Sequence, residues 1–279
     1  MTTDTLTVTP TQRTAKHQHY LMCRPEHFDV TYTINPWMDP TAPVDAALAL
    51  RQWEILRETY LSLGHTVDLI NPVEGLPDMV FAANGGIVLD GRAMASRFTH
   101  DERAAEGQLY LDWFAAAGLT PAVQATEQNE GEGDVLRIGD IFLAGTGFRT
   151  SLAAHREIAT FFSTEVVSLE LVDPRFYHLD TALTVLDDEN VAYFPGAFSD
   201  ASLEILRARF PDAVIATADD ARVFGLNAMS DGYNVVLSAR AVDLHRELRA
   251  RGYNPVGVDL TELLKAGGSA KCCTLEIRA

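Results

Sequence analysis

Two cysteines stand next to each other near the end of the chain, in the segment GGSAKCCTLEIR. A thiolate is a strong nucleophile, the glycines before it allow close backbone approach, and Lys271 offers a positive charge that would stabilise it. If the segment is a final strand, Cys272 and Cys273 point to opposite faces, so at most one of them faces a site. A cysteine in an apolar strand is also commonly a small core residue, and the residues alone leave that alternative open.

A histidine and an aspartate stand two residues apart in the segment FYHLDTAL. If this segment is extended, His178 and Asp180 point to the same face. A histidine beside a carboxylate can act as an oriented general acid or base. The alternative is a hydrogen-bonded structural histidine.

Acidic residues recur in polar segments, namely Asp78, Glu130, Glu132, Asp134 and Asp180, and the middle three stand beside glycines. Paired carboxylates match the planar fork of a guanidinium group. Arg103 and Arg149 are candidates to hold a carboxylate at the other end of an amino acid. Each residue alone is typical of a surface charge, but their joint occurrence favours a small guanidino substrate.

Other classes of site lack their motifs. No G-x-G-x-x-G follows the first strand and no G-x-x-x-x-G-K-[ST] occurs, which argues against dinucleotide and nucleoside triphosphate binding. Adjacent cysteines cannot chelate zinc as C-x₂-C does, so we expect no metal site and no cofactor. The formal net charge of −17 argues against sequence-independent nucleic-acid binding. It fits a cationic small molecule, although an acidic surface also simply favours solubility.

The chain alternates short apolar runs with segments of helical period, without an internal linker. Residues 1–16 are expected to form a flexible N-terminal arm and residues 17–279 a single catalytic domain. Helices are expected within 42–64 and near 100–118, 150–162, 199–209 and 239–252; strands are expected at 65–70, 79–82, 86–89, 140–145, 163–171, 181–186, 191–195, 213–217, 233–239 and 272–278. The class is therefore α/β. No run of apolar residues reaches the length of a membrane span and the polar start lacks a secretory pattern, so a cytoplasmic location is expected.

In this order, the segments PDMVFAAN, EGEGD, GFRT, HLDT and GGSAKC resemble the guanidine-modifying enzymes, over roughly residues 20–279. That superfamily includes arginine deiminases, dimethylarginine dimethylaminohydrolases, amidinotransferases and arginine dihydrolases. The resemblance implies the pentein α/β-propeller, with pseudo-fivefold ββαβ units around a polar channel. Periodicity in the sequence does not show this fold.

The resemblance also implies residue roles. Cys272 takes the place of the nucleophile, His178 that of the general acid and base, and Glu130 that of the guanidinium-binding glutamate of the catalytic set. Because the usual EGGD reads EGEGD here, Glu132 is a possible substitute for Glu130. The expected substrate-binding residues are Asp78, Asn84, Asp180, Arg103, Arg149, Asn35 and Phe81, with Arg103 and Arg149 on the substrate carboxylate.

Asn84 stands where deiminases and dimethylarginine hydrolases carry aspartate, and the segment INPWM with Asn35 is similar to bacterial arginine dihydrolases. An asparagine accepts from a guanidinium N–H and also donates to the ureido oxygen of citrulline, which makes a second hydrolysis conceivable. The expected activity is therefore conversion of arginine to ornithine, carbon dioxide and ammonia. A dimethylarginine hydrolase or deiminase that stops at citrulline is the first alternative; an amidinotransferase and a non-catalytic arginine sensor are further ones. Homo-oligomerisation is left open.

Overall fold

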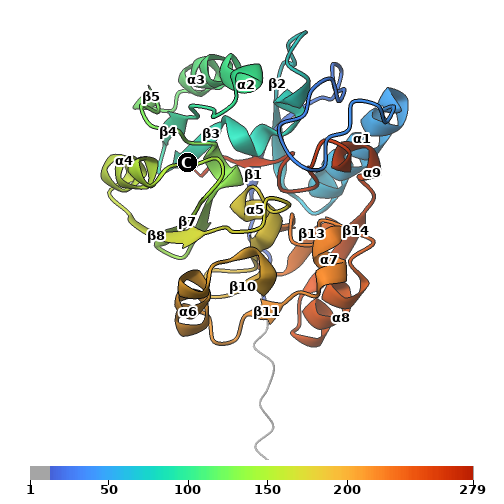
Figure 1. The fold of residues 1–279 in the computed structure, drawn as a ribbon, viewed down its shortest axis with the longest axis vertical. Helices are drawn as coiled ribbons and strands as arrows, with labels where there is room; N and C mark the ends of the chain where they lie inside the picture. The colour runs from blue at the N-terminus through green and yellow to red at the C-terminus, as the bar shows by residue number, and fades with distance from the viewer. Residues whose placement is uncertain (1–12, 279) are drawn as a thin grey trace, which may run out of the picture.

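A computed structural model describes residues 13–278 and shows five small sheets arranged in a ring (Figure 1). Each sheet has three strands, and its central strand runs antiparallel to one neighbour and parallel to the other. A helix on the outside of the ring joins the two parallel strands of each unit. The expected α/β-propeller of pseudo-fivefold ββαβ units is therefore confirmed.

The strands, sheet by sheet, are β15 (Leu275–Glu276), β1 (His19–Cys23) and β2 (Thr66–Ile70); β3 (Gly86–Leu89), β4 (Arg92–Ala95) and β5 (Ala122–Gln124); β6 (Val135–Ile138), β7 (Ile141–Thr146) and β8 (Glu165–Glu170); β9 (Leu183–Val185), β10 (Val191–Tyr193) and β11 (Val214–Ile215); β12 (Met229–Ser230), β13 (Asn234–Ser238) and β14 (Asn254–Val258). The helices are α1 (Ala46–Ser62), α2 (Asp101–Ala104), α3 (Glu106–Ala116), α4 (Leu152–Phe162), α5 (Leu179–Ala182), α6 (Asp200–Arg209), α7 (Ala218–Arg222), α8 (Val242–Ala250) and α9 (Thr261–Leu264). Short 3₁₀ turns are η1 (Pro77–Val80), η2 (Ala82–Gly85), η3 (Gly131–Gly133) and η4 (Pro195–Ala197).

The two ends of the described chain close the ring. The last strand, β15, pairs antiparallel with β1, and Glu276 lies opposite Tyr20 in the register. The unit that contains β1 and β2 thus takes its antiparallel edge strand from the other end of the sequence. This pairing places the turn that carries Cys272 directly before a strand of the ring.

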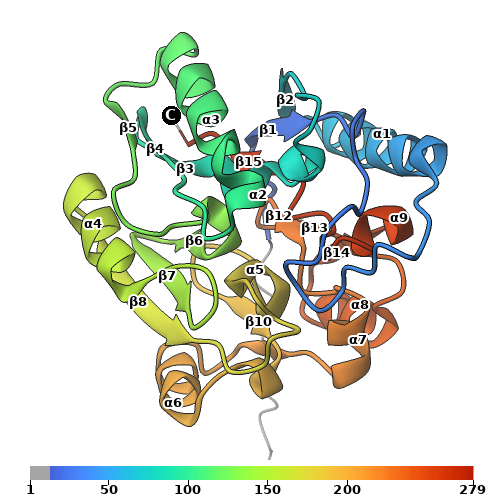
Figure 2. The same cartoon turned by 45° about the horizontal axis from the view of Figure 1, so that its top comes forward.

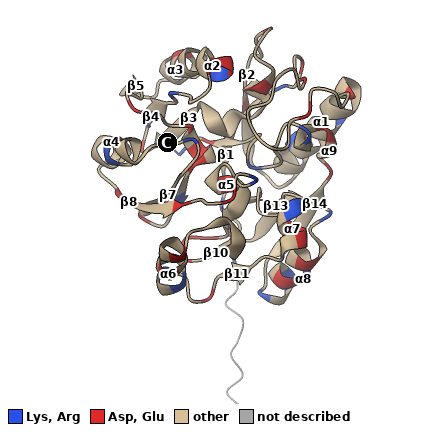
Figure 3. Cartoon of the chain, viewed as in Figure 1, with Lys and Arg blue, Asp and Glu red and all other residues tan. Residues whose placement is uncertain are grey.

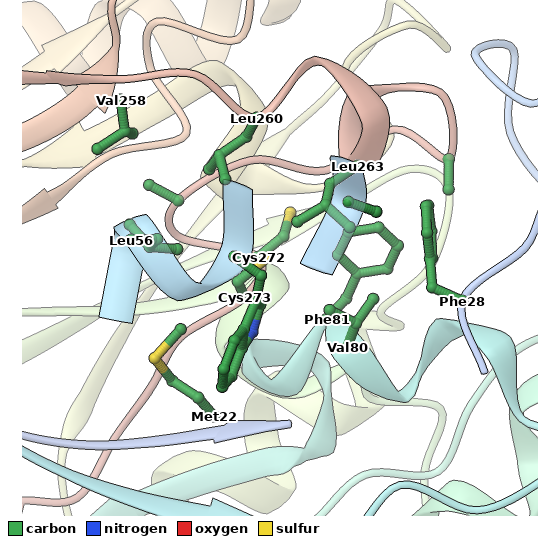
Figure 4. Packing of buried hydrophobic residues seen from close by; sticks show 14 of the residues in the cluster. Met22, Phe28, Leu56, Val80, Phe81, Val258, Leu260, Leu263, Cys272 and Cys273 are labelled. Carbon is green, nitrogen blue, oxygen red and sulfur yellow. The ribbon is translucent and has the colours of Figure 1, made fainter. Parts of the chain in front are cut away.

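Helix α1 shows how the local sequence builds an outer layer. The Asp45 side chain accepts from the backbone N–H of Leu48 at 2.9 Å and so caps the helix N-terminus. Its buried face includes Trp53, Leu56 and Tyr60, at helical spacing. This face packs on a hydrophobic cluster that reaches Cys272, Cys273, Phe81 and Leu263 (Figure 4). The two cysteines therefore lie where the outer layer meets the centre of the ring.

Four local expectations differ from the structure. Residues 79–82 form 3₁₀ turns rather than a strand, and Cys272 and Cys273 lie in a turn that precedes the short strand β15. The segment from His178 to Asp180 is not extended throughout, because α5 begins at Leu179. The helix expected at 100–118 is divided into α2 and α3. In each case one short turn replaces a regular element, and so short a segment has no period that the sequence could show.

The predicted arm at 1–16 lies mostly outside the described residues. Arg13 forms an ion pair with Asp187, and the Lys16 backbone N–H donates to the Asp231 carbonyl at 2.8 Å. The single-domain boundary at 17 stays a prediction. Acidic and basic residues mark the outer helices, and acidic ones also lie beside α5 near the middle of the ring (Figure 3). Within 13–278 no helix has the length and hydropathy needed to cross a membrane.

Candidate active site

The candidate residues come from the short segments that precede the first antiparallel strand of each unit. Asn84 precedes β3, Glu130 precedes β6, Asp180 precedes β9 and Cys272 precedes β15. Asn227, which the sequence analysis missed, precedes β12 in the same way. All of these side chains are buried. The ring thus repeats one arrangement, a polar residue in a tight turn just before a strand, and gathers those residues in its interior.

The thiol of Cys272 lies between an acid and an amide. Its Sγ is 3.2 Å from Asp180 Oδ2, to which it donates, and 3.1 Å from Nδ2 of Asn227. Burial raises the pKa of Cys272 well above its ordinary value, and the neighbouring Asp180 raises it further. The resting group is therefore a thiol, and its ionisation requires compensation of the negative charge on Asp180.

Asn227 uses its whole side chain to hold this region. Its Oδ1 accepts from the backbone N–H groups of Ser269 (3.1 Å) and Cys272 (3.0 Å). Its Nδ2 also donates to the Asp180 carbonyl at 3.2 Å. The amide therefore joins the cysteine turn to α5. In the sequence, Asn227 stands just before a strand, in the segment GLNAMS. That position marks it as a candidate only once the five-fold repeat of the structure is known.

Lys271 does not lie beside the Cys272 thiol, where the sequence led us to expect it to stabilise a thiolate. Its Nζ donates to Glu132 Oε2 at 2.6 Å and to the Thr274 carbonyl at 3.0 Å. Glu132 also binds Arg278 at 2.5 Å and the backbone N–H of Glu276 at 2.9 Å. Both carboxylate oxygens of Glu132 are thus occupied by the chain's C-terminal segment. The glutamate that contacts the histidine is Glu130.

Glu130 connects a histidine and an arginine. Its Oε2 is 2.8 Å from His178 Nε2 and 2.9 Å from Arg149 Nη1, and its Oε1 accepts from the Thr99 N–H at 3.0 Å. Burial alone would raise the pKa of Glu130, but Arg149 and the hydrogen bond with His178 outweigh it and hold this pKa well below its usual range. The carboxylate is therefore ionised at neutral pH and orients the imidazole through Nε2.

The start of α5 separates the two members of the HLD motif. Asp134 Oδ1 accepts from the Leu179 N–H at 3.0 Å, which fixes the first turn. As a result His178 reaches Glu130, whereas Asp180 reaches Cys272. Burial raises the pKa of Asp180 to about 7 and that of Asp134 to about 6.

Asp78 and Asn84 lie on the η1 and η2 turns. Asp78 Oδ2 accepts from the Tyr32 hydroxyl at 2.9 Å, and burial raises the pKa of Asp78. Asn84 Oδ1 accepts from Arg103 Nη1 at 2.7 Å, while its Nδ2 is 3.5 Å from the Glu130 carbonyl oxygen. Three polar atoms of the site are buried and have no hydrogen-bond partner within the described part of the chain. They are Asp78 Oδ1, Asp180 Oδ1 and His178 Nδ1.

The two arginines are engaged with other protein groups. Arg103 binds both oxygens of Glu106 at 2.8 Å, and Arg149 Nη2 donates to the Ile34 carbonyl at 2.6 Å with its guanidinium over the Tyr177 ring. Binding of a substrate carboxylate by either arginine stays a prediction. In this structure neither guanidinium is free of protein partners.

The segment between β1 and α1 reaches over the ring toward α5 and α7 (Figure 2). Asn35 belongs to it; its Nδ2 donates to the Ala266 carbonyl at 3.0 Å and its Oδ1 accepts from the Trp37 N–H at 2.9 Å. Trp37 Nε1 in turn donates to the Arg175 carbonyl at 2.8 Å. Phe81 packs closely on Gly268, where a Cβ would lie 2.3 Å from its ring. Direct substrate contacts of Asn35 and Phe81 stay predictions.

Metal ligation has no candidate among residues 13–278, where no three His, Cys, Asp or Glu side chains are grouped to hold an ion. The cluster instead combines a thiol, an imidazole held by a carboxylate, and buried acids with open oxygens. Such a set can carry out nucleophilic attack with proton transfer on a cationic carbon centre.

Comparisons with known proteins agree with this chemistry. The chain is 57% identical to a dimethylarginine dimethylaminohydrolase of Mycobacterium tuberculosis over 96% of its own length and 88% of that protein. It is 40% identical to the bifunctional arginine dihydrolase/ornithine cyclodeaminase ArgZ of Synechocystis, over 92% of this chain but only 37% of that one. No protein-family model matches the chain.

Solved structures show the same relationship. The N-terminal domain of ArgZ bound to its substrate superposes with a TM-score of 0.89 at 38% identity, covering 94% of this chain and 98% of that one. A dimethylarginine dimethylaminohydrolase adduct superposes at 0.77 with 18% identity, which shows a common fold. The chain therefore belongs to the family of dimethylarginine dimethylaminohydrolases and arginine dihydrolases, hydrolases that act on guanidino C–N bonds.

Proposed function

We propose that this protein is an arginine dihydrolase that releases ornithine, carbon dioxide and ammonia. The observation that carries the proposal is the Asn84 amide. Its Oδ1 is held by Arg103, so its NH₂ group points the other way, to within 3.5 Å of the Glu130 carbonyl oxygen; a Cβ on Gly133 would lie 2.2 Å from Asn84 Nδ2 and 3.1 Å from His178 Nδ1. An N–H donor beside the general acid suits a neutral ureido oxygen as well as the guanidinium stage of the reaction.

Recognition of arginine is assigned to the buried acids. Asp78 Oδ1 and Asp180 Oδ1 have no partner among residues 13–278 and can accept from guanidinium N–H groups. Because burial keeps these oxygens from water, a matching cation gains more than it would at the surface. Two methyl groups on one nitrogen would remove its N–H donors and leave an acid poorly paired, which favours unsubstituted arginine.

The first hydrolysis starts from the thiol. The substrate cation offsets the charge of Asp180, so the Cys272 proton can pass to solvent and the thiolate attacks the guanidinium carbon. A C–S bond forms, a C–N bond breaks, and His178 supplies the proton that lets ammonia depart. His178 then removes a proton from water, which attacks the same carbon; the C–S bond breaks and citrulline results.

The second hydrolysis repeats the attack on bound citrulline. Asn84 Nδ2 donates to the ureido oxygen as negative charge develops on it, the role of an oxyanion donor. Ornithine leaves with a proton from His178, and the remaining thiocarbamoyl group is hydrolysed to carbamate, which breaks down to ammonia and carbon dioxide. Cys272 returns to the thiol.

A dimethylarginine dimethylaminohydrolase is the second candidate, and one observation favours it. The M. tuberculosis protein of that name is more similar in sequence, at 57% identity, than the Synechocystis ArgZ at 40%. It would use the same nucleophile and stop at citrulline after losing dimethylamine. The amidinotransferase and sensor alternatives are not proposed, because the named relatives are hydrolases.

The test is to incubate the purified protein separately with arginine, citrulline and asymmetric dimethylarginine and to identify the amino-acid products by mass spectrometry. Ornithine from arginine, with little free citrulline, supports the proposal. Citrulline as the end product from dimethylarginine would overturn it in favour of the second candidate. Undiminished arginine turnover by a Cys272→Ser protein would overturn the covalent scheme itself.

Two broader assignments belong to the same proposal. A cytoplasmic location is supported by the three cysteines, which are all free and buried. Homo-oligomerisation stays a prediction, to be measured by light scattering.

A further inference from the structure

The orientation of Asn84 depends on a residue outside the substrate-facing cluster. Asn84 is 2% exposed and its carbonyl oxygen accepts from Arg103 Nη1 at 2.7 Å. An asparagine side chain can present either its carbonyl or its NH₂ group by a half-turn of the amide. The donor at Arg103 selects one of these orientations, in which Nδ2 lies 3.5 Å from the Glu130 carbonyl oxygen and, like His178 Nδ1, next to Gly133.

Arg103 is itself held rigidly. Its Nε and Nη2 donate to the two oxygens of Glu106 at 2.8 Å each, and Nη2 also donates to the Asp78 carbonyl at 3.1 Å. The guanidinium lies 4.7 Å from the Phe98 ring centroid. A two-point ion pair fixes the plane of an arginine, and hence the direction of the remaining Nη1.

Glu106 is fully buried at the first turn of α3, and Arg103 is 3% exposed at the end of α2. Arg103 and Glu106 are three positions apart, on either side of the break between α2 and α3, and their ion pair is buried. Asp78 and Glu130 also attract Arg103 through their charges. Without Glu106 the guanidinium would turn toward those acids, and Asn84 would lose its fixed donor.

We propose that Glu106, acting through Arg103, is a positioning residue that holds the Asn84 NH₂ group toward the reacting carbon and so favours retention of citrulline for the second hydrolysis. The inference rests on the proposed dihydrolase function. It gives Arg103 a role in addition to the carboxylate contact that the family resemblance implies, which stays a prediction. In this role Arg103 orients Asn84 without contacting the reacting carbon itself.

The decisive measurement is the ratio of citrulline to arginine affinity, obtained by calorimetry in a Cys272→Ser background. Glu106→Gln keeps the shape and one acceptor but removes the charge that fixes both nitrogens. We expect the Kd for citrulline to rise about tenfold, the loss of one well-placed hydrogen bond, and the Kd for arginine to change less than about threefold. Equal changes in both constants, or no change in either, would overturn the proposal.

Glu262→Gln is the matched control. Glu262 is also buried and forms an ion pair with a residue three positions away, Lys265, at 2.7 Å, but it contacts the N-terminus of α1 and not Asn84. This variant is expected to leave the affinity ratio unchanged. A purely structural role of Glu106 would make the two variants alike in this ratio.

A second variant tests the same proposal if the Glu106→Gln protein does not fold. Arg103→Lys keeps a cation beside Glu106 but cannot span Glu106 and Asn84 with one nitrogen, so the same shift in affinity ratio is expected. In proteins that retain Cys272, both variants should release more citrulline per ornithine formed. If the unaltered protein makes no ornithine, the proposed function fails, while the binding ratio still decides the role of Glu106.

Discussion

Glu130 and Glu132 are two residues apart at one short turn, and both are fully buried. The polar groups around them differ in how completely they are hydrogen-bonded within the protein. Glu132 belongs to a C-terminal ionic cluster with Lys271, Glu276 and Arg278, in which two cations meet two anions. Glu130 belongs to the candidate active site with His178 and Arg149.

Unpaired atoms separate the two regions. Of the eight buried side-chain polar atoms without a partner in residues 13–278, four belong to the active-site residues Asp78, Asp134, His178 and Asp180, and none to the C-terminal ionic cluster. The active site therefore keeps buried polar atoms that a ligand can pair, whereas the charged side chains of the ionic cluster pair with one another and hold the last strand in the ring. This difference predicts that substitutions in the first region change the reaction and substitutions in the second change the fold.

The largest expected effect is on catalysis by Glu130→Gln. Loss of the charge removes the partner that orients His178 and the anion that balances Arg149, so kcat for arginine should fall by about 10³. Steady-state ammonia release measures this, with circular dichroism to show that the protein is folded. A kcat within tenfold of the unaltered protein would falsify the assignment of Glu130 to the reaction.

Glu132→Gln should act on stability instead. Two buried cations, Lys271 and Arg278, would keep only Glu276 as an anionic partner, and breaking a buried ion pair costs about 3 kcal/mol or more. Urea denaturation measures the loss, while kcat per folded molecule should stay within about threefold. A stable but inactive Glu132→Gln protein would mean that the two glutamates have been assigned the wrong way round.

Asp180→Asn tests the active-site region through the reactivity of its thiol. Burial and then the Asp180 charge raise the pKa of Cys272, so removal of that charge should lower this pKa. Alkylation by iodoacetamide at pH 8 should become about tenfold faster, although arginine turnover falls because a guanidinium contact is lost. Asp220→Asn, at a buried capping residue of α7, serves as the control with unchanged alkylation. Slower alkylation in Asp180→Asn would contradict the geometry around Sγ.

The smallest effect concerns stability in acid. The pKa of Glu130 is depressed in the folded protein, so its contribution is present above the unfolded-state pKa of about 4.3 and is lost as pH falls below that value. The free energy of unfolding should therefore decline less between pH 5 and pH 3 in Glu130→Gln than in the unaltered protein. Denaturation curves at the two pH values give the comparison, and identical declines would argue against the depressed pKa.

The family relationship explains why so much of the chemistry was visible before the fold. The order of EGEGD, HLDT and GGSAKC along the chain carries the resemblance, and the comparisons show the same family and the same fold. Amphipathic helices such as α1 also followed from the sequence, because burial of Trp53, Leu56 and Tyr60 repeats with the period of a helix. Local structure was mispredicted where 3₁₀ turns at 77–85 replace a strand, since such turns have no period to read.

The sequence by itself thus determined the set of reactive groups, because residue type and order are local properties. Only the tertiary structure decided which groups meet. It directs Lys271 to Glu132 and not to the thiol, brings Asn227 to Cys272, and places Arg103 against Asn84. The physical reason is that a buried charge takes the partner that ring closure and the breaks between helices place within hydrogen-bonding distance, and residues far apart in sequence do not reveal that partner in advance.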